Sequence, residues 1–304
     1  MSTKTKEDSR MVHSKRAVVT GATSGIGEAI ARQLAAHGMA VVLVGRSDDR
    51  LEQARQRILA AVPDAELRLE RADLALLSDV RELAKRLSHE PVPDVVVSDA
   101  AVIAEVGDVT SEGLQRTLVT NHLAPYLLLR SLIDPLGERS ARFVVVGADP
   151  GALHRAPVDL DDLGCETGRG LGKVASMRPF VAYGRTKNMN AMFVYALARR
   201  LEGRRITVNG VHPGIIKGTG LGRDSRGALK IFGSLLGLDP RLPGPEVGAD
   251  TPAWLATSPE VDGVTGKFYV KREQVTTAPH TTDVARCDRL WDESARLVGL
   301  SPAL

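Results

Sequence analysis

A tyrosine and a lysine lie four residues apart in the segment Tyr183-Gly-Arg-Thr-Lys187, near the start of a helix expected over about 181–201. Residues at this spacing share one face of a helix. An ammonium beside a phenol stabilises the phenolate and lowers the pKa of the phenol. Such a tyrosine can donate or accept a proton near neutral pH. The pair therefore predicts acid–base chemistry, although the spacing by itself is common by chance.

A glycine-rich segment, Thr20-Gly-Ala-Thr-Ser-Gly-Ile-Gly27, joins an expected strand at 16–19 to an expected helix that ends near Gly38. A helix N-terminus offers free N–H groups to an anion. A turn without Cβ atoms lets a pyrophosphate approach the backbone. This context favours nucleotide binding over a tight turn without a ligand. The expected cofactor contacts are Gly21, Thr23, Ser24, Gly25, Ile26 and Gly27.

An arginine follows the second expected strand, which covers 40–44. In dinucleotide-binding folds this position meets the adenosine ribose, where an acidic side chain would bind the 2′-hydroxyl group. Arg46 stands there instead, and a guanidinium suits a 2′-phosphate. The sequence therefore predicts NADP rather than NAD. The alternative is an arginine that only flanks the next helix, for which Ser47 is the expected N-cap.

Strands and helices alternate along the chain, with further strands expected at 67–70, 95–97, 142–146 and 206–211. This alternation predicts the α/β class: a single-domain, Rossmann-type, doubly wound parallel sheet of about seven strands with helices on both faces. The length of 304 residues suits one large domain, placed at 15–304. The polar segment 1–14 is expected to be a disordered tail.

Composition excludes several classes of function. The formal net charge of +3 gives no electrostatic case for binding nucleic acid or an anionic membrane. The two cysteines, Cys165 and Cys287, have no metal-binding or redox spacing, so neither a metal nor a disulfide framework is expected. No apolar run approaches the ~20 residues that span a bilayer, and no signal peptide is evident. These features predict a soluble, cytoplasmic protein without a membrane span.

Two polar residues have open roles. Asp73 follows the third expected strand and would either bond an adenine amino group or cap the next helix. Asn121 lies within an apolar helical pattern over 113–132 and needs partners there. It would either bind a water at a bend or be satisfied structurally. Pro125, four residues later, predicts a local kink.

Five segments in a fixed order resemble the short-chain dehydrogenase/reductase family, especially its retinol-dehydrogenase-like and protochlorophyllide-reductase-like branch. They are the glycine segment, Ala72-Asp73-Leu74, Asn121-His122-Leu123, Tyr183-Gly-Arg-Thr-Lys187 and Val208-Asn209-Gly-Val-His212-Pro213-Gly214. The segment 257–267 is also similar, and the resemblance covers roughly 14–300. Five ordered motifs are specific for the fold and less specific for the reaction.

The resemblance implies an NADP(H)-dependent oxidoreductase that moves hydride to or from a carbonyl, alcohol or enone. Tyr183 would supply or remove the hydroxyl proton, while Lys187 would lower the tyrosine pKa and hold the nicotinamide ribose. Asn121 would anchor a water in the proton relay. Further cofactor contacts are implied at Asp73, Leu74, Ala100, Pro213, Gly214 and Ile216.

The chain departs from the family pattern in three places. Ala148 fills the position of a serine that bonds the substrate oxygen, and loss of one such donor costs on the order of 10²–10³ in rate. Whether Asp149 replaces it stays open. The family's Asn-Asn-Ala-Gly reads Ser98-Asp-Ala-Ala101, and its threonine after Pro-Gly falls at Thr219. These departures leave open a non-redox enzyme on the same scaffold, such as a cyclase, dehydratase or isomerase, and a catalytically silent binding subunit.

An apolar insert at about 215–245 is either a cover over a hydrophobic substrate or an extra core helix. Met177 and Phe180 would add to the same pocket. The expected partner is therefore a small-molecule substrate that is bulky and hydrophobic. The last helical pattern, 284–297, suits packing or the surface of a homo-oligomer. Frequent arginine and alanine indicate a GC-rich bacterial genome, where a step in secondary metabolism would fit.

Overall fold

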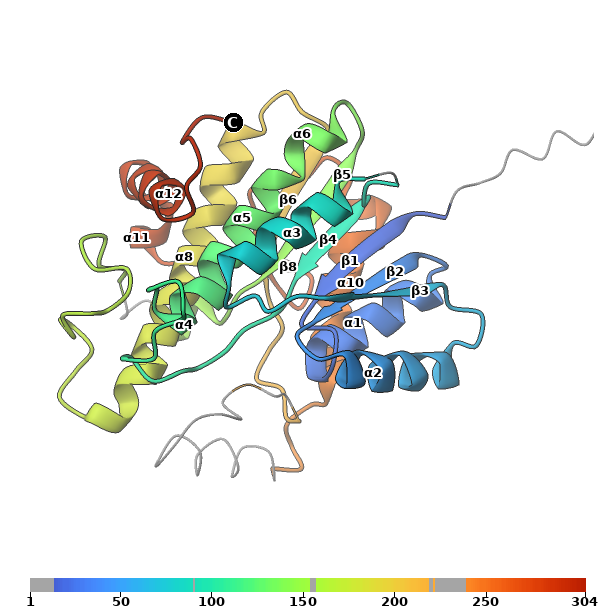
Figure 1. Cartoon of the computed structure of the whole chain (residues 1–304), viewed down its shortest axis with the longest axis horizontal. Coiled ribbons are helices and arrows are strands. Elements are labelled where there is room, and N and C mark those ends of the chain that lie inside the picture. The colour runs from blue at the N-terminus through green and yellow to red at the C-terminus, as the bar shows by residue number, and fades with distance from the viewer. Residues whose placement is uncertain (1–13, 90, 154–156, 219–220, 222–238) are drawn as a thin grey trace, which may run out of the picture.

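The computed structural model describes residues 14–89, 91–153, 157–218, 221 and 239–304 (Figure 1). The tail expected at 1–14 therefore lies outside the described residues except for Ser14. Most of the insert expected at 215–245 lies outside them as well, so its role remains a prediction. Thr219 also falls outside.

One sheet of eight strands runs through the described chain in the order β3-β2-β1-β4-β5-β6-β7-β8. The first seven strands pair in parallel, whereas β8 runs antiparallel to β7. The strands are β1 (Arg16–Thr20), β2 (Ala40–Gly45), β3 (Leu67–Arg71), β4 (Val95–Ser98), β5 (Ala141–Val146), β6 (Ile206–His212), β7 (Phe268–Val270) and β8 (Glu273–Val275). The α/β, doubly wound parallel sheet is confirmed, and the predicted number of about seven strands was one too low.

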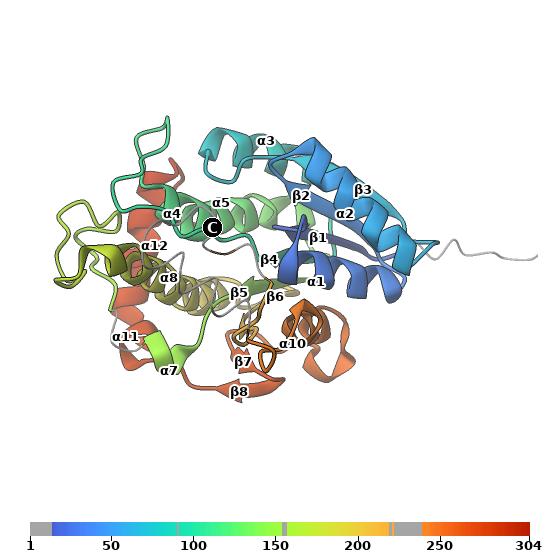
Figure 2. The ribbon, with the colours of Figure 1, turned by 90° about the horizontal axis from the view of Figure 1, so that it is seen from below.

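Helices cover both faces of this sheet, which explains why its central strands read as continuous apolar runs. Figure 2 shows α1 and α10 on the opposite side of the sheet from α3 and α5. Two buried clusters match this layering: one joins α1, α2 and α10 to the sheet, and the other joins α3, α5, α8 and α12. These helices are α1 (Gly25–Ala36), α2 (Asp48–Ala61), α3 (Leu77–Leu87), α5 (Ala124–Ser131), α8 (Arg178–Arg200), α10 (Pro245–Thr257) and α12 (Val284–Leu297).

Shorter helices join these elements. They are α4 (Arg116–Leu118), α6 (Ile133–Leu136), α7 (Pro150–Leu153), α11 (Pro279–Thr282), two 3₁₀ turns at Ala175–Met177 and Pro259–Val261, and the π-helical segment η1 (Val119–Leu123). The Ser47 cap is confirmed, since its side chain accepts the N–H of Arg50. Among the described helices, none is both long enough and apolar enough to cross a membrane.

The helix expected over 113–132 is divided at the predicted distortion. It consists of α4, then η1, then α5, in which Pro125 is the second residue. Proline has no N–H with which to bond the carbonyl four residues earlier, here that of Asn121. A π-helical turn at this point places Asn121 and His122 inside the protein, where both are buried.

The C-terminal helix α12 packs against α8, and this favours the packing interpretation of its apolar pattern. Leu290 and Trp291 are buried there. The guanidinium carbons of Arg130 and Arg200 lie 4.6 Å and 4.4 Å from the centroid of the Trp291 ring. Arg130 also donates to the carbonyls of Ser301 and Ala303, which fixes the end of the chain over α5.

Candidate active site

The turn between β1 and α1 is shaped for an anion. Gly21 and Gly25 have φ values of 71° and 60°, which favour glycine. A Cβ at Gly21 would lie 2.9 Å from the Cα of Ala100, so the backbones touch there. Ser24 precedes the first turn of α1 and makes no side-chain cap. The N–H groups of that turn are therefore presented where no Cβ intervenes, and this fits a dinucleotide pyrophosphate.

Other predicted cofactor contacts gather around this turn. The methyl group of Thr23 packs on Gly45 at the end of β2. Ile26 and Ile216 both pack on Gly248 of α10, which brings the segment after β6 alongside the glycine turn. That segment contains Pro213, Gly214 with a φ of 94°, and Ile216. Loops that are far apart in the sequence thus meet at the carboxyl ends of the strands.

Three arginines lie near the end of β2. Arg46 is exposed directly after β2. Arg50 donates to the hydroxyl of Ser24 at 3.4 Å, and this contact places a second guanidinium beside the glycine turn. Arg71 at the end of β3 pairs in register with Gly45. This arrangement can bind a phosphate at the end of β2.

Asp73 caps the backbone in this structure. Its carboxylate accepts the N–H of Ala75 at 3.0 Å, and its own N–H donates to Asp79 at 2.9 Å. This geometry favours the capping interpretation over a bond to adenine. Leu74 next to it is buried in the core against α3.

Tyr183 and Lys187 lie buried on the same face of α8. The Lys187 ammonium donates to the carbonyl of Val146 at the end of β5, at 2.9 Å. Its nitrogen is 5.6 Å from the centroid of the Tyr183 ring. The helix therefore places a phenol and an ammonium together at the carboxyl ends of the central strands, where ligands bind in such sheets.

The electrostatics of the pair differ from the sequence prediction. Burial raises the pKa of the Tyr183 phenol well above its usual range, and the nearby Asp99 carboxylate adds to the rise. Burial also lowers the pKa of Lys187 to about 8, against the opposing effect of Asp99. The predicted fall in the tyrosine pKa is therefore wrong for the chain by itself, because removal of the phenolate from water outweighs a cation placed beside the ring.

Asn121 connects the loop after β4 to α8. Its side-chain oxygen accepts the N–H of Val102 at 2.8 Å, and its amide donates to the carbonyl of Val102 and to the hydroxyl of Thr186, both at 3.0 Å. Thr186 in turn donates to the carbonyl of Tyr183 at 2.7 Å. The side chain is satisfied structurally, and its part in a water relay remains a prediction.

Replacing Asn121 with alanine should lower the free energy of unfolding by about 2–4 kcal/mol, because the change leaves both backbone groups of Val102 without their partner. Urea denaturation of the two proteins measures this difference. Thr186→Val removes one of the three Asn121 bonds and the bond from Thr186 to the Tyr183 carbonyl, leaves both backbone groups of Val102 paired, and should cost less, about 1–2 kcal/mol. A loss below about 0.5 kcal/mol for Asn121→Ala would contradict the structural role.

The position of the missing serine remains without a hydroxyl group. Ala148 lies two residues beyond β5 and is partly buried. Asp149 is exposed, and its carboxylate accepts the N–H of Gly151 at 2.8 Å. It is therefore engaged with α7, and in its ionised form it has no proton to donate.

Comparison with known proteins decides the family. The short chain dehydrogenase model matches residues 15–156. Human retinol dehydrogenase 13 is 33% identical over 291 residues, covering 94% of this chain and 85% of the relative. The chain belongs to the short-chain dehydrogenase/reductase family. It falls in the retinol-dehydrogenase-like branch that the sequence motifs indicated.

A Streptomyces relative and a solved structure extend the comparison. The "Putative daunorubicin C-13 ketoreductase DnrU" of Streptomyces sp. (strain C5) is 35% identical over 287 residues, covering 93% of this chain and 92% of the relative. A substituted form of actinorhodin polyketide ketoreductase, crystallised with NADPH, superimposes with a TM-score of 0.63 at 22% identity. The match covers 84% of this chain and 95% of the ketoreductase chain, and it supports the fold. Short-chain dehydrogenases are oxidoreductases that use a nicotinamide cofactor.

This short-chain dehydrogenase has an apolar surface next to its tyrosine. The ring of Phe180 stacks on that of Tyr183 with centroids 6.0 Å apart and an interplanar angle of 27°. Phe180, Met177 and Val174 are among the exposed large apolar side chains. Ile103, from the loop after β4, packs against Tyr183.

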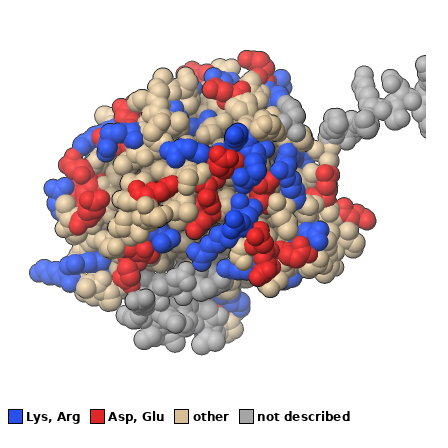
Figure 3. All heavy atoms as spheres, viewed as in Figure 1, with Lys and Arg blue, Asp and Glu red and all other residues tan. Residues whose placement is uncertain are grey.

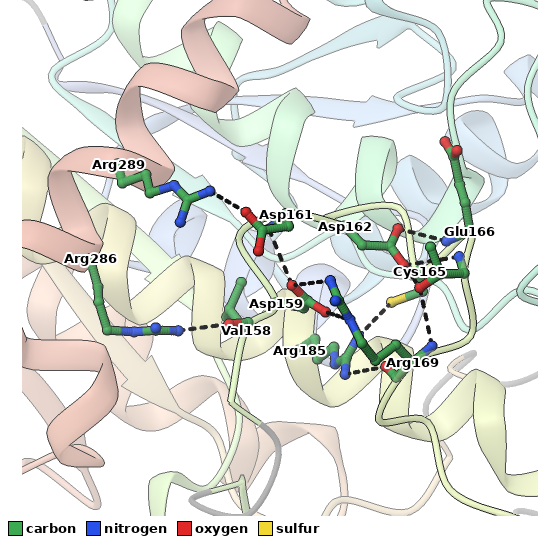
Figure 4. Close-up of polar contacts among 11 residues, drawn as sticks. Val158, Asp159, Asp161, Asp162, Cys165, Glu166, Arg169, Arg185, Arg286 and Arg289 are labelled. Carbon is green, nitrogen blue, oxygen red and sulfur yellow. Dashed lines mark hydrogen bonds and ion pairs between the residues drawn. The ribbon is translucent and has the colours of Figure 1, made fainter.

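The loop before α8 is held by ion pairs and hydrogen bonds (Figure 4). Arg289 of α12 pairs with Asp161, and Arg286 donates to the carbonyl of Val158. Arg185, between the tyrosine and the lysine of the motif, donates to the carbonyl of Arg169 at 2.7 Å. Helices α8 and α12 therefore hold the loop that leads to the exposed apolar side chains of Val174, Met177 and Phe180, which together form the Phe180 surface.

Surface charge over one face is mixed. In Figure 3 basic and acidic side chains are interspersed, and Lys and Arg atoms gather near the centre of the view. Among the described residues, no group of His, Cys, Asp and Glu side chains is arranged to hold a metal ion.

Asp99 is the site residue whose part the sequence did not reveal. Its position was noted only as a departure from the family pattern. The fold places its carboxylate between the glycine turn and Lys187. No signal in the linear sequence connects residue 99 to residue 27.

Proposed function

We propose that this short-chain dehydrogenase is an NADP(H)-dependent oxidoreductase that acts on a bulky hydrophobic carbonyl compound or the corresponding alcohol. One observation carries the proposal: the buried Tyr183–Lys187 pair lies at the carboxyl end of β5, beside the exposed ring of Phe180 that stacks on Tyr183. The ketoreductase name of the Streptomyces relative supports a ketone as the substrate.

Each group of site residues has a separate role in the proposed reaction. The glycine turn and the first turn of α1 bind the pyrophosphate, while Arg46 and Arg50 bind the 2′-phosphate. Lys187, already bonded to Val146, has two further N–H groups for ribose hydroxyls. When bound, the nicotinamide supplies or accepts the hydride. Tyr183 donates its proton to the carbonyl oxygen during reduction and accepts it in the reverse direction.

The Phe180 surface sets the substrate class. Its exposed apolar side chains favour a flat or ring-bearing ketone over a small polar one. We propose that the insert at 215–245 covers the substrate; Ile215 at its start is 62% exposed. A tailoring step on a bacterial secondary metabolite would present such a ketone.

The direct test incubates the purified protein with NADPH and a panel of ring-bearing ketones and enones. We expect the consumption of NADPH to match the formation of alcohol or of reduced enone one to one. Binding of NADPH without turnover of any carbonyl, alcohol or enone, including intermediates from its own gene neighbourhood, would contradict the proposal.

A non-redox reaction on the same scaffold is the second candidate, and the Ala148 position favours it. The methyl group cannot donate a hydrogen bond to a substrate oxygen, and Asp149 is engaged with Gly151. A product with unchanged oxidation state, formed without net loss of NADPH, would establish this candidate. The same assay therefore separates the two functions.

Replacing Arg46 with alanine should raise the Kd for NADPH by about 10- to 100-fold and leave the Kd for NADH within about twofold. Hydrogen bonds from a guanidinium to an ionised group contribute about 1.5–3 kcal/mol, and NADH lacks the 2′-phosphate. Fluorescence titration of both nucleotides measures the change. Arg55→Ala is the control, since Arg55 pairs with Glu52 on α2. An equal loss for both nucleotides would assign Arg46 no part in cofactor choice.

A further inference from the structure

Asp99 lies where the loop after β4 meets the glycine turn. Its N–H donates to the hydroxyl of Thr20 at 3.1 Å, and the N–H of Ala100 reaches the same hydroxyl at 3.3 Å. These bonds fix the loop to the end of β1. The residue as a whole is partly exposed, but its carboxylate points inward against α1.

The carboxylate reaches the first turn of α1. A Cβ built on Gly27 would lie 2.8 Å from the Oδ2 atom of Asp99. The N–H of Gly27, the third residue of the helix, lies close enough to this carboxylate to favour its ionised form. Asp99 therefore uses one of the helix N-terminal donors that would otherwise face an anionic ligand.

On its other side, the carboxylate faces α8. The Lys187 ammonium attracts it, and the Tyr183 phenol is the second titratable group it affects. Within the part of the chain that the structure describes, the groups acting on Asp99 are Lys187 from α8 and the N–H of Gly27 from α1. Lys187 makes its hydrogen bond to Val146 rather than to Asp99.

Burial favours the protonated form of this carboxyl group. Burial raises its pKa to about 6, with Lys187 and the Gly27 N–H opposing the rise. At pH 7 the free protein therefore carries a mostly ionised carboxylate directly beneath the turn that fits a pyrophosphate. An additional anion bound to that turn would repel this charge, and repulsion between like charges favours the protonated acid.

We propose that binding of NADP(H) at the glycine turn is coupled to uptake of a proton by Asp99, which makes Asp99 a positioning residue that sets the pH dependence of cofactor affinity. The inference rests on the proposed cofactor site. The proton comes from solvent and adds to a carboxylate oxygen of Asp99. The neutral acid removes the repulsion, while the Gly27 N–H remains bonded to its carbonyl oxygen.

Thermodynamic linkage gives the direction in which NADP(H) affinity changes with pH. The bound state holds the proton to a higher pH than the free state, so affinity is highest below about pH 6 and falls as pH rises above it. The fall continues up to the pKa of the bound form. Its slope is at most tenfold in Kd for each pH unit, because one proton is exchanged.

The test compares the full-length protein with Asp99→Asn, a change of nearly equal size that cannot ionise. Calorimetric titration with NADPH at pH 7.0, in two buffers of different ionisation enthalpy, counts the protons taken up. We expect the native protein to take up more protons than the variant, by up to one. We also expect its Kd to rise between pH 6.5 and 8 by up to tenfold per unit relative to the variant. The ionisation of the nucleotide itself is common to both and cancels.

Asp149→Asn is the matched control, since this exposed carboxylate after β5 bonds Gly151 instead of the turn. It should behave as the native protein does. Equal proton uptake and parallel pH profiles for the native protein and Asp99→Asn would overturn the inference while leaving the cofactor site intact. Failure of the native protein to bind NADPH would overturn the proposed function and this inference with it. Should Asp99→Asn not fold, Asp99→Ser removes the same charge, and the same comparison decides.

Discussion

Replacing Tyr183 with phenylalanine is expected to lower kcat/KM for ketone reduction by about 10²–10⁴-fold, the contribution of a positioned general acid. The Kd for NADPH should stay within about twofold. The ring contacts with Ile103 and Phe180 remain in the variant, so the site keeps its shape. The variant lacks only the phenolic hydroxyl group, whose proton the carbonyl oxygen would receive.

The electrostatics of the site favour the phenol as the proton donor in the proposed reduction. Its pKa lies well above the usual range because of burial and Asp99, so it is protonated throughout the neutral range. Reduction of a ketone starts from that form. We expect Lys187, whose nitrogen lies 5.6 Å from the centroid of the Tyr183 ring, to stabilise the phenolate that proton transfer would leave behind.

Tyr195→Phe provides the control for this change. Tyr195 lies further along the same helix, and its hydroxyl bonds that of Thr277 at 2.9 Å. Turnover should be unchanged in that variant. Normal turnover in Tyr183→Phe would remove the acid–base assignment. Absence of any turnover in the native protein, on redox and non-redox substrates alike, would favour the catalytically silent subunit.

The fold was predictable where the sequence pattern is local. Apolar runs located β1 to β6, and the helices 77–87 and 284–297 end where the pattern ends. The hairpin of β7 and β8 was missed because each strand has three residues. Lys271 and Arg272, which connect them, adopt φ values of 50° and 63° without the glycine that usually indicates such a turn. Nothing in their residue types predicts the turn.

The site was predictable in its parts and not in its charges. Spacing placed Tyr183 and Lys187 on one helix face, and glycines located the turn. The direction of the tyrosine pKa was wrong because burial is a tertiary property, and a four-residue spacing does not reveal it. Asp99 acts on both parts from a third segment, and only the packing of β4 beside β1 brings it there.

Replacing Gly27 with alanine is expected to weaken NADPH binding by about 5- to 150-fold. The added Cβ would lie 2.5 Å from the carbonyl oxygen of Gly21 and 2.8 Å from the Asp99 carboxylate. Neither distance is tolerated, so the turn must open. Overpacking of this kind costs about 1–3 kcal/mol. If the closed conformation of the turn binds the nucleotide, destabilising that conformation by this amount raises the Kd by the stated range.

Gly107→Ala separates this effect from a general loss of glycine. A Cβ at Gly107 meets no atom within 4 Å, and Gly107 is not among the residues with positive φ. Its Kd for NADPH, measured by fluorescence titration, should match that of the native protein. Native affinity in Gly27→Ala would show that the turn opens without cost, and the pyrophosphate could then not depend on its closed form.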